Sequence, residues 1–294
     1  MKVAIYGQYY QNSTEPIVKE IFGFFIKNKV EMVIESNFLN VLCEKKIIKK
    51  NFKTFTLNTD LDNSFDMLIS IGGDGTILKA STLVRDSGIP ILGINAGRLG
   101  FLATVKKENI AEFMQLIIEK KYTISKRSLL NLSCIPDNLA IQDINFAMNE
   151  ITVNRKDNTS MITVETYLNN EYLNSYWADG LIIATPTGST GYSMSCGGPI
   201  LTPDVKSLVI TPIAPHNLNA RPLVIPDETE IRLKVSGREE HYLVSLDSRV
   251  ISVKNETILV IKKTPFQINM VEISKETFLK TLRTKLYWGE DRRN

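Results

Sequence analysis

Short apolar runs alternate with helix-like patterns along the first 125 residues of the chain. After the apolar run Lys2–Tyr6, apolar side chains recur at the spacing of one helix face, and Ser13, Thr14 and Pro16 supply capping and first-turn chemistry. Such alternation predicts a parallel, doubly wound α/β sheet. The predicted strands are Lys2–Tyr6, Val30–Glu35, Met67–Ile71 and Ile89–Asn95, and the predicted helices carry Ile17, Ile21 and Phe24, then Phe38, Leu39 and Leu42, then Ile77, Ala80 and Val84, and last Ile110, Phe113, Met114 and Ile117.

The pattern changes near Arg127, where β-rich runs with period-two alternation begin. Turn clusters such as Asn169-Asn170 and Ser236-Gly237 separate these runs. We therefore predict an N-terminal doubly wound, Rossmann-like α/β domain over residues 1–125 and a C-terminal, mainly antiparallel β-sandwich domain over residues 126–272. A helical tail over residues 275–294 is expected to pack back on the first domain. The β-rich runs are Met161–Leu168, Ile231–Val235, Tyr242–Leu246, Thr257–Lys263 and Phe266–Ile273.

Composition narrows the class of protein. The chain has 294 residues, of which 43% are hydrophobic, so it can bury a sizeable core. The formal net charge of +3 is nearly balanced and gives no reason to expect nucleic acid or an anionic membrane as a partner. The basic cluster Lys45, Lys46, Lys49 and Lys50 is expected to be a solvated helix face.

Targeting and redox signals are weak. The amino terminus lacks the pattern of a signal peptide, and no apolar stretch reaches the roughly 18–20 residues of a membrane span. The three cysteines, Cys43, Cys134 and Cys196, are too far apart for a disulfide framework or a zinc site. A soluble cytoplasmic protein is expected.

A glycine-rich turn, Gly72-Gly73-Asp74-Gly75-Thr76, follows a buried-strand pattern and precedes a helix expected to start at Ile77. Glycines let the backbone approach phosphate oxygens, and the unpaired N–H groups of a first helical turn point outward. The arrangement predicts a phosphate site at Gly72, Gly73, Gly75 and Thr76. It is neither a Walker A loop nor a Gly-x-Gly-x-x-Gly fingerprint.

Asp74 needs its own explanation, because a carboxylate repels phosphate. Two functional roles fit: it accepts a proton from an attacking hydroxyl, or it holds Mg²⁺ bound to the phosphates. A plain turn residue or a helix N-cap is the alternative. The turn resembles the Gly-Gly-Asp-Gly signature shared by diacylglycerol kinases, sphingosine kinases and NAD kinases. That signature indicates phosphoryl transfer without choosing the acceptor.

Two later segments bear on the acceptor. Asn95–Leu102 packs two glycines into a loop after a strand, although alone it is typical of an ordinary βα turn. Asn149 and Glu150 place an amide beside a carboxylate, a pair that can hydrogen-bond ribose hydroxyls or an adenine amine. Neighbouring residues of a strand point to opposite faces, so an exposed edge or a bulge is the alternative for this pair.

Two further segments are polar and glycine-rich or basic. Trp177–Pro199 gathers hydroxyls and glycines around Tyr192, which suits hydrogen bonding to a nucleotide and stacking on it. Pro215–Pro226 places His216 in a turn with Arg221 close by. Alone, His216 is better explained as a structural histidine.

In this order, the segments resemble the NAD kinase family over nearly the whole chain, from Lys2 to Ile273. Lipid kinases share only the glycine–aspartate turn. The resemblance implies transfer of the γ-phosphoryl group of ATP, with Mg²⁺ or another divalent ion, to the 2′-hydroxyl of the adenosine ribose of NAD⁺. The products are NADP⁺ and ADP. It also implies a homo-oligomer, a dimer or a tetramer, in which a neighbouring subunit completes the site.

The same resemblance assigns roles to residues of this sequence. Asp74 matches the proton acceptor, Asp179 approaches the nicotinamide end, and Asn149 with Glu150 binds ribose and adenine. The other matched NAD contacts are Gly75, Lys79, Thr187, Thr190, Gly191, Tyr192, Ser193, Met194, Ser195 and Ala214, with His216 and Arg221 near the site.

Two positions depart from the family pattern. Gly191 stands where many relatives have alanine, with little consequence expected. Ser248 stands where relatives usually have glycine, which leaves the turn geometry and any substrate contact from Arg249 open.

Two other functions remain as alternatives. A lipid or diacylglycerol-type kinase would share the turn but need an apolar acceptor pocket, and the polar run Thr187–Ser195 argues against one. A non-catalytic dinucleotide-binding regulator would have no need of Asp74 as a base. We expect small-molecule nucleotides as partners, neither nucleic acid nor a membrane, and a cleft between the two domains in which Asp74 is aimed at one ribose hydroxyl.

Overall fold

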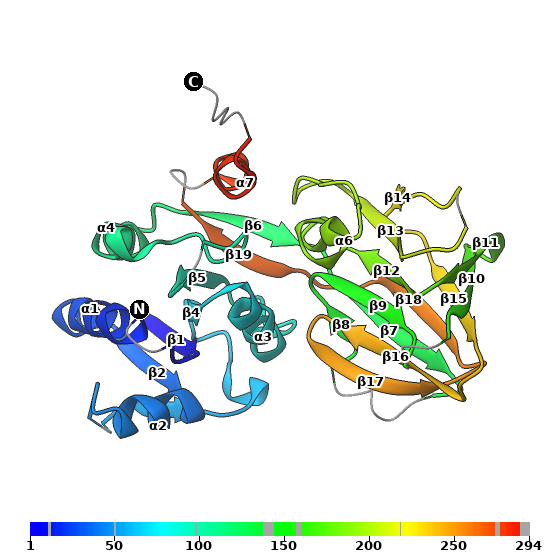
Figure 1. The fold of residues 1–294 in the computed structure, drawn as a ribbon. Helices are drawn as coiled ribbons and strands as arrows, with labels where there is room; N and C mark the ends of the chain where they lie inside the picture. Colours follow the sequence, from blue (N-terminus) through cyan, green and yellow to red (C-terminus); the bar gives the residue numbers. More distant parts are fainter. Residues whose placement is uncertain are drawn as a thin grey trace. The chain divides into compact units, whose positions relative to one another are not determined.

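Two separate hydrophobic cores divide the chain into two units. Unit 1 holds Met1–Lys126 together with the chain from Ile268 onward, and unit 2 holds Arg127–Gln267 (Figure 1). The computed structural model describes residues 1–10, 13–49, 51–97, 99–137, 144–156, 160–217, 219–273 and 277–288.

A seven-stranded sheet organises unit 1. In spatial order its strands are β3 (Lys53–Phe55), β2 (Glu31–Glu35), β1 (Lys2–Gly7), β4 (Met67–Gly72), β5 (Ile91–Asn95), β19 (Ile268–Glu272) and β6 (Thr123–Arg127). The strands from β3 to β5 pair in parallel, and the chain runs outward from β1 to β3 before it returns to β4 beside β1. This reversal confirms the predicted doubly wound α/β fold.

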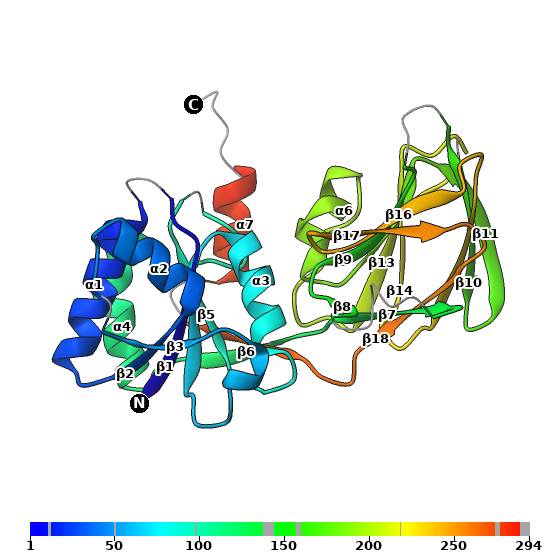
Figure 2. The same ribbon diagram turned by 90° about the horizontal axis from the view of Figure 1, so that it is seen from below.

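Helices cover both faces of this sheet. They are α1 (Thr14–Lys27), α2 (Ser36–Glu44), α3 (Asp74–Val84), α4 (Ile110–Ile118) and α7 (Phe278–Leu286), with short 3₁₀ turns at Asn58–Asp60 and Lys107–Asn109. α1 lies beside α4 on one face, and α3 lies on the other (Figure 2). α1 buries Ile17, Ile21 and Phe25 in the core. Within unit 1, the Phe278 ring of α7 lies 6.2 Å from the ring centroid of Phe101.

The start of α1 differs from the prediction. Ser13 occupies the N-cap position, but its side chain makes no capping hydrogen bond. The Thr14 hydroxyl instead accepts the N–H of Tyr10 at 2.8 Å and so ties the loop after β1 to the helix.

The basic cluster and the start of α3 also differ from the prediction. α2 ends at Glu44, and Lys46 has a left-handed φ of 58°, so the lysines follow the helix and do not line its face. Lys50 lies outside the described residues. α3 begins at Asp74 and not at Ile77, with Gly73 as its N-cap.

Unit 2 consists of two six-stranded sheets packed face to face. One sheet holds, in spatial order, β11 (Glu171–Ala178), β10 (Ile162–Leu168), β15 (Ile231–Ser236), β18 (Ile258–Lys263), β7 (Leu130–Ile135) and β8 (Phe146–Ala147), and the other holds β14 (Leu223–Pro226), β13 (Ser207–Ile213), β12 (Gly180–Ala184), β9 (Glu150–Asn154), β16 (His241–Leu246) and β17 (Arg249–Lys254). The strands of each sheet pair antiparallel. Val164 and Leu233 of one sheet share a core with Leu181 and Val244 of the other. The predicted antiparallel β-sandwich is confirmed.

The run Phe266–Ile273 was expected inside the β-rich domain. It instead supplies β19 to the sheet of unit 1, where Met270 pairs in parallel with Ile91 of β5. The chain therefore returns to the first unit before the predicted boundary at residue 272. The expected helical tail contributes α7, and residues 274–276 and 289–294 lie outside the described residues.

Gly7, at the end of β1, tests the packing of this fold. A Cβ added there would lie 2.6 Å from Cζ of the buried Phe38 ring. Gly7→Ala should lower the free energy of unfolding by about 1–3 kcal/mol, the usual cost of overpacking. Gly23→Ala is the matched control: nothing lies within 4 Å of its Cβ, and alanine inside α1 should stabilise by about 0.5–1 kcal/mol. Urea unfolding of both variants checks this, and equal effects would contradict it.

Candidate functional site

The turn from β4 to α3 brings the glycine-rich motif to the carboxyl edge of a parallel sheet, where ligands of open α/β sheets bind. A Cβ on Gly72 would lie 2.2 Å from Thr76 Oγ1, so the turn closes only around a glycine at this position. Around Gly73 and Gly75, nothing lies within 4 Å of an added Cβ. The backbone at these two glycines is therefore open to a ligand.

Thr76 is buried and ties the turn to the loop after β1. Its hydroxyl accepts the Gly73 N–H at 3.3 Å and donates to Gln8 Oε1 at 3.1 Å, and its own N–H donates to the Gly73 carbonyl at 3.0 Å. The hydroxyl and the backbone N–H of Thr76 both make hydrogen bonds within the protein. Direct phosphate binding by Thr76 stays a prediction. The outward donors of the first helical turn are then the N–H groups of Asp74 and Gly75.

The Asp74 carboxylate holds the loop after β5. Oδ2 accepts the Phe101 N–H at 2.8 Å, and Oδ1 accepts the N–H groups of Leu102 and Ala103 at 3.0 Å each. A Cβ on Gly100 would lie 1.8 Å from Oδ1, so the loop can close on the carboxylate only with a glycine there. A carboxylate oxygen offers about two acceptor positions. Oδ2 can therefore accept one further hydrogen bond.

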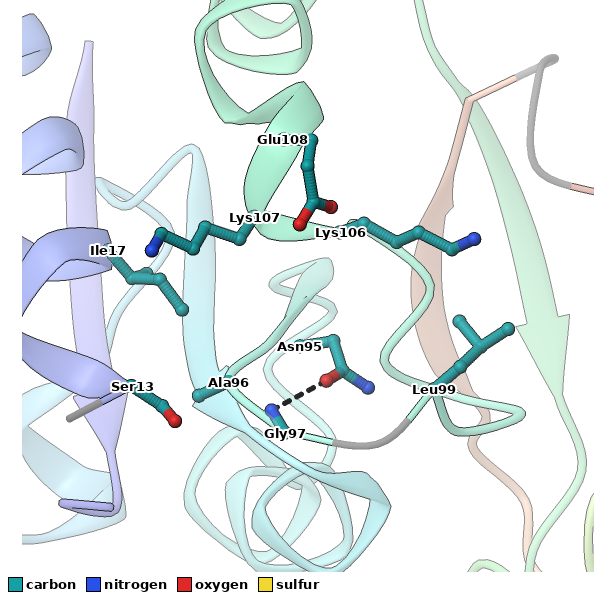
Figure 3. Close-up of a pocket in the computed structure, with 9 residues that line it drawn as sticks. All are labelled: Ser13, Ile17, Asn95, Ala96, Gly97, Leu99, Lys106, Lys107 and Glu108. Carbon is teal, nitrogen blue, oxygen red and sulfur yellow. Dashed lines mark hydrogen bonds between the residues drawn. The ribbon is translucent and has the colours of Figure 1, made fainter. Parts of the chain in front are cut away.

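Asn95 fixes the other end of the same loop. Its Oδ1 accepts the Gly97 N–H at 2.7 Å and its Nδ2 donates to the Ala103 carbonyl at 3.3 Å (Figure 3). The segment that resembled an ordinary βα turn is thus tied to Asp74 and to β5. Beside it lies a polar hollow of about 370 Å³, toward which Lys107 extends beside Ile17 (Figure 3).

In unit 2, Asn149 and Glu150 lie where β8 passes into β9. Asn149 precedes β9 and Glu150 begins it, so the strict alternation of strand side chains does not separate them. A Cβ on Gly191 would lie 3.0 Å from Glu150 Oε2 and 3.5 Å from Asn149 Nδ2, so both side chains reach the same point. Glu150 Oε2 and Asn149 Oδ1 are buried and have no hydrogen-bond partner among the described residues. Such atoms are costly unless a ligand pairs with them.

Asp247, at the tip of the β16–β17 hairpin, holds this segment in place. Its carboxylate accepts the N–H groups of Met148 at 2.9 Å, Asn149 at 2.8 Å and Glu150 at 3.2 Å. Its own N–H donates to the Glu150 carbonyl at 3.0 Å. The sequence analysis singled out only Ser248 and Arg249 of this hairpin tip, and the role of Asp247 as the support of the Asn149–Glu150 pair was missed.

The structure answers the question raised by Ser248. Among the described residues of this hairpin tip, Asp247 has a left-handed φ of 53°, whereas Ser248 has no positive φ. A serine therefore fits without backbone strain where relatives have glycine. The Arg249 guanidinium donates to the Ile144 carbonyl at 2.7 Å and to that of Phe146, so it supports the backbone that leads into Asn149.

Burial raises the pKa of Glu150 to about 8, and the nearby Asp247 carboxylate acts in the same direction against one N–H bond from Tyr192. Burial also raises the pKa of Asp247, opposed by its three backbone N–H donors and by Arg249. A Glu150 that holds its proton near neutral pH can both donate and accept a hydrogen bond. That ability suits a ribose hydroxyl or an adenine ring.

The hydroxyl-rich loop after β12 is attached to the same segment. The Thr185 hydroxyl donates to the Met148 carbonyl at 2.6 Å and accepts the Gly188 N–H at 3.1 Å. A Cβ on Gly188 would lie 2.0 Å from the Asn149 carbonyl oxygen, so glycine is needed for this close approach. The loop and the Asn149–Glu150 pair therefore form one cluster.

The predicted contacts inside this loop differ in exposure. Tyr192 is 43% exposed, whereas the Ser193 hydroxyl is buried against Thr211 Oγ1 at 2.8 Å. The Thr190 hydroxyl donates to the Thr187 carbonyl at 3.1 Å. Tyr192 is thus able to offer a ring face, while Ser193 braces the loop. Met194 and Ser195 complete the short helix α6 (Tyr192–Ser195), and Gly188–Thr190 form the 3₁₀ turn before it.

Asp179 lies between β11 and β12 and pairs with Arg155 at 3.1 Å, a partner that the sequence did not reveal. Burial and Cys196 raise the pKa of Tyr192, and smaller contributions come from the Asp179 and Glu150 carboxylates. Tyr192 is therefore within electrostatic range of both acidic groups.

The segment after β13 is ordered by local contacts. The centroids of the His216 and Trp177 rings lie 4.4 Å apart, and the backbone N–H of His216 donates to the Trp177 carbonyl at 2.8 Å. Ala214 has a left-handed φ of 42°. Arg221 Nη1 donates to the Ala220 carbonyl at 2.8 Å.

Metal ligands are sparse. Over the described ranges, no group of three or more His, Cys, Asp and Glu side chains is arranged to hold a metal ion. Mg²⁺ is usually held by one or two carboxylates together with substrate phosphates and water. The free acceptor position of Asp74 Oδ2 fits that pattern and does not fit an all-protein cage. Separately, no described helix is both long enough and apolar enough to cross a bilayer.

Comparison with known proteins identifies the family. Residues 3–122 match the ATP-NAD kinase N-terminal domain and residues 148–273 match the ATP-NAD kinase C-terminal domain. Over the whole of both chains, the protein is 74% identical to the NAD kinase of Flavobacterium johnsoniae, and over 98% of both it is 38% identical to that of Porphyromonas gingivalis. The chain belongs to the ATP-NAD kinase family.

Solved structures have the same fold. Yeast NADH kinase complexed with NADH has a TM-score of 0.88 at 23% identity, over 99% of this chain and 89% of that one. An NAD kinase from Archaeoglobus fulgidus in complex with ATP has a TM-score of 0.71 at 25% identity, over 98% of both chains. The two-unit architecture is therefore that of NAD(H) kinases.

The raised pKa of Glu150 predicts a pH-dependent stability. The folded protein holds the Glu150 proton from the ordinary value of 4.5 up to about 8, whereas the unfolded chain releases it near the ordinary value, so this carboxyl lowers the free energy of unfolding as pH rises through that window. Glu150→Gln removes the titration. The stability of the variant relative to wild type should therefore increase between about pH 5 and pH 8. Urea unfolding across this range measures it, with Glu171→Gln on the exposed start of β11 as the control. A difference that stays flat with pH would contradict the prediction.

Proposed function

We propose that this protein transfers the γ-phosphoryl group of ATP to the 2′-hydroxyl of the adenosine ribose of NAD⁺ and produces NADP⁺ and ADP. Membership of the ATP-NAD kinase family and 74% identity to a curated NAD kinase over the full chain support this activity. The structural observation that carries it is the Asp74 carboxylate, fixed by three N–H groups beside an open glycine turn with one acceptor position left.

In the proposed reaction, Asp74 acts as the general base. Its Oδ2 accepts the proton of the 2′-hydroxyl while that oxygen forms a bond to the γ-phosphorus. The bond between this phosphorus and the bridging oxygen breaks, and its electron pair leaves with ADP. Base assistance of this kind is typically worth about 10²–10⁴ in rate.

The backbone of the β4–α3 turn would stabilise the phosphate charge. The N–H groups of Asp74 and Gly75 begin α3, and the open backbone of Gly73 allows phosphate oxygens to come close. Mg²⁺, where bound, would neutralise further charge on the phosphates. The one free acceptor position of Asp74 Oδ2 is given to the 2′-hydroxyl in this reaction, so the ion would be held by the phosphates and water.

Unit 2 would recognise the acceptor. The unpaired oxygens of Asn149 and Glu150 supply hydrogen-bond capacity for ribose and adenine, and the exposed ring of Tyr192 supplies a stacking face. Following the family resemblance, we assign Asp179 to the nicotinamide end. The further NAD contacts that we propose are Lys79, Thr187, Thr190, Gly191, Ser193, Met194, Ser195 and Ala214, with His216, Arg221 and Arg249 as supporting residues.

Family membership removes the support for a lipid kinase, and no observation favours a purely regulatory protein. We propose that the chain works in the cytoplasm and, following the same resemblance, that it is a homo-oligomer that uses a divalent metal ion. We assign it neither nucleic acid nor a membrane as a partner.

Asp74→Asn tests the base. With ATP, Mg²⁺ and NAD⁺, the wild-type protein should form NADP⁺, which an NADP⁺-specific dehydrogenase detects. The variant should lose about 10²–10⁴ in kcat, because an amide accepts no proton, while NAD⁺ binding measured by calorimetry persists.

Asp86→Asn, an exposed aspartate just after α3, is the control and should retain full activity. Absence of NADP⁺ with every phosphoryl donor would contradict the proposed kinase activity. Full turnover by Asp74→Asn would contradict only the general-base role of Asp74.

Gly100→Ala tests the support of Asp74 without changing the carboxylate itself. The new Cβ would lie 1.8 Å from Oδ1 and must displace the carboxylate or the loop, so kcat should fall at least tenfold. Gly97→Ala, in the same loop with nothing within 4 Å of its Cβ, should change kcat less than twofold. Steady-state kinetics of the two variants separates a general effect of alanine in the loop from displacement of Asp74.

A further inference from the structure

A hollow of about 600 Å³ opens at the amino edge of the sheet of unit 1, the edge opposite the glycine-rich turn. Each of α1 and α2 starts after the carboxyl end of a parallel strand and runs back, so the carboxyl ends of both helices lie at this edge. These two helix ends and the segment that leads to β3 line the hollow. The volume is within the usual range of small-molecule pockets, roughly 300–1,000 Å³. The residues assigned above to catalysis and to substrate binding lie elsewhere.

The wall of this hollow is apolar. Phe22 of α1 is buried, and its ring stands edge-on to the half-buried ring of Phe52, with the centroids 5.4 Å apart. Ile48 and Cys43 are half-buried against the same core. Ile26 also lines the hollow and is 62% exposed. Contiguous apolar surface that is open to solvent marks a site where something binds.

Two lysines supply the charge of this hollow. Among the described residues of its lining, Lys46 and Lys49 are the charged ones, and both are exposed. No ion pair within the described chain involves either lysine. An apolar wall with two available ammonium groups is suited to a ligand that is apolar at one end and anionic at the other.

The end of α2 fixes Lys46 beside the wall. The Ile47 N–H donates to the Leu42 carbonyl at 2.9 Å. The Lys46 N–H donates to the Cys43 carbonyl at 2.9 Å, and these two bonds make a Schellman motif. Lys46 has the left-handed φ of 58° that the motif requires, and Ile47 is buried in the core. The chain therefore turns sharply after α2, which brings Lys46 and Lys49 into the lining.

We propose that this hollow binds a free medium-chain fatty acid, a single alkyl chain with an anionic head. The alkyl chain lies against the apolar wall, and the carboxylate pairs with Lys46 and Lys49 through charge-assisted hydrogen bonds. The inference does not rest on the proposed kinase function, because the hollow lies at the other edge of the sheet from the glycine-rich turn.

The distribution of the apolar surface favours an alkyl chain over a second protein chain. Of the large apolar side chains in the described lining, Ile26 alone is mostly exposed, whereas Phe22 and Phe52 are buried or half-buried. The apolar surface therefore lies inside the hollow. An alkyl chain can enter there, whereas the packed core of a protein interface needs side chains that protrude. A second copy of this chain would also have to bring carboxylates to both lysines.

Chain length tests the apolar wall. Hexanoate, octanoate and decanoate, titrated into the purified protein in a calorimeter, should each bind at one site. Each added pair of methylenes should lower Kd about tenfold, the gain expected when both become buried. Decyltrimethylammonium has a chain of the same length as decanoate but a positive head, so it should not bind.

Replacement of the lysines tests the anionic head. Lys46→Asn together with Lys49→Gln should raise the Kd for decanoate at least tenfold, because the charge-assisted bonds are lost, and should change the binding of uncharged decanol less than twofold. Asparagine tolerates the left-handed φ at position 46. Lys120→Asn is the matched control. Lys120 also follows a helix, α4, with a left-handed φ of 54°, and it lies outside the lining, so decanoate binding should not change.

Cys43 gives a second measurement on the wild-type protein. Its free thiol lines the hollow, so decanoate should slow its alkylation by iodoacetamide at least fivefold, as followed by mass spectrometry. Alkylation of Cys196, a free thiol in unit 2, is the internal control and should not change. Cys43→Phe places a ring in the hollow and should abolish decanoate binding, with urea unfolding as the check that the variant is folded.

Two results would overturn the inference. One is that decanoate does not bind, or binds wild type and the double lysine variant equally without protecting Cys43, which would exclude the hollow as its site. The other is that wild type does not bind decanoate while Cys43→Phe changes the sedimentation coefficient, which would show that a second copy covers the hollow. Neither result bears on the formation of NADP⁺, which tests the proposed function separately.

Discussion

A carboxylate that accepts three consecutive backbone N–H groups controls the key loop in each unit. Asp74 holds the amides of Phe101–Ala103, and Asp247 holds those of Met148–Glu150. Hydrogen bonds to a charged acceptor are worth more than neutral ones, about 1.5–3 kcal/mol each, and three converging bonds also restrict the backbone to one conformation. Each loop is thereby set in place before any ligand binds, which reduces the ordering cost of binding.

The two carboxylates then diverge in role. Asp74 keeps an acceptor position and lies beside open glycine backbone, so it can serve both the loop and a substrate. Asp247 directs its acceptor capacity to the protein and adds negative charge near Glu150, which helps to raise the pKa of that group to about 8. The unpaired oxygens of Asn149 and Glu150 lower the stability of the isolated unit. A bound nucleotide that pairs with them would recover that loss as affinity.

Local sequence patterns predicted the helices and strands better than the contacts between residues far apart in the chain. The continuous apolar run of β4 predicted a strand buried on both faces, as in the α/β unit. The alternating runs of unit 2 predicted strands buried on one face, as in the sandwich. The start of α3 was predicted too late in the chain because Asp74 and Gly75 have low helix propensity. The glycine-rich turn nevertheless places both residues in the first turn of the helix. The roles of Asp247 and of the loop after β5 were missed because the Asp247–Asn149 and Asp74–Phe101 hydrogen bonds join residues 98 and 27 positions apart, which no local window contains.

The strand β19 has a consequence for the order in which this protein is made. It lies between β5 and β6 in the sheet of unit 1, yet the ribosome synthesises it after all of unit 2. Until then, β6 lacks its neighbour and β5 is an open edge with buried apolar residues such as Ile91 and Ile94 at risk of exposure. Open edges of this kind invite pairing with other chains. The nascent first unit therefore depends on rapid completion of the chain, or on chaperone protection, and cannot be cut free as an independent amino-terminal fragment.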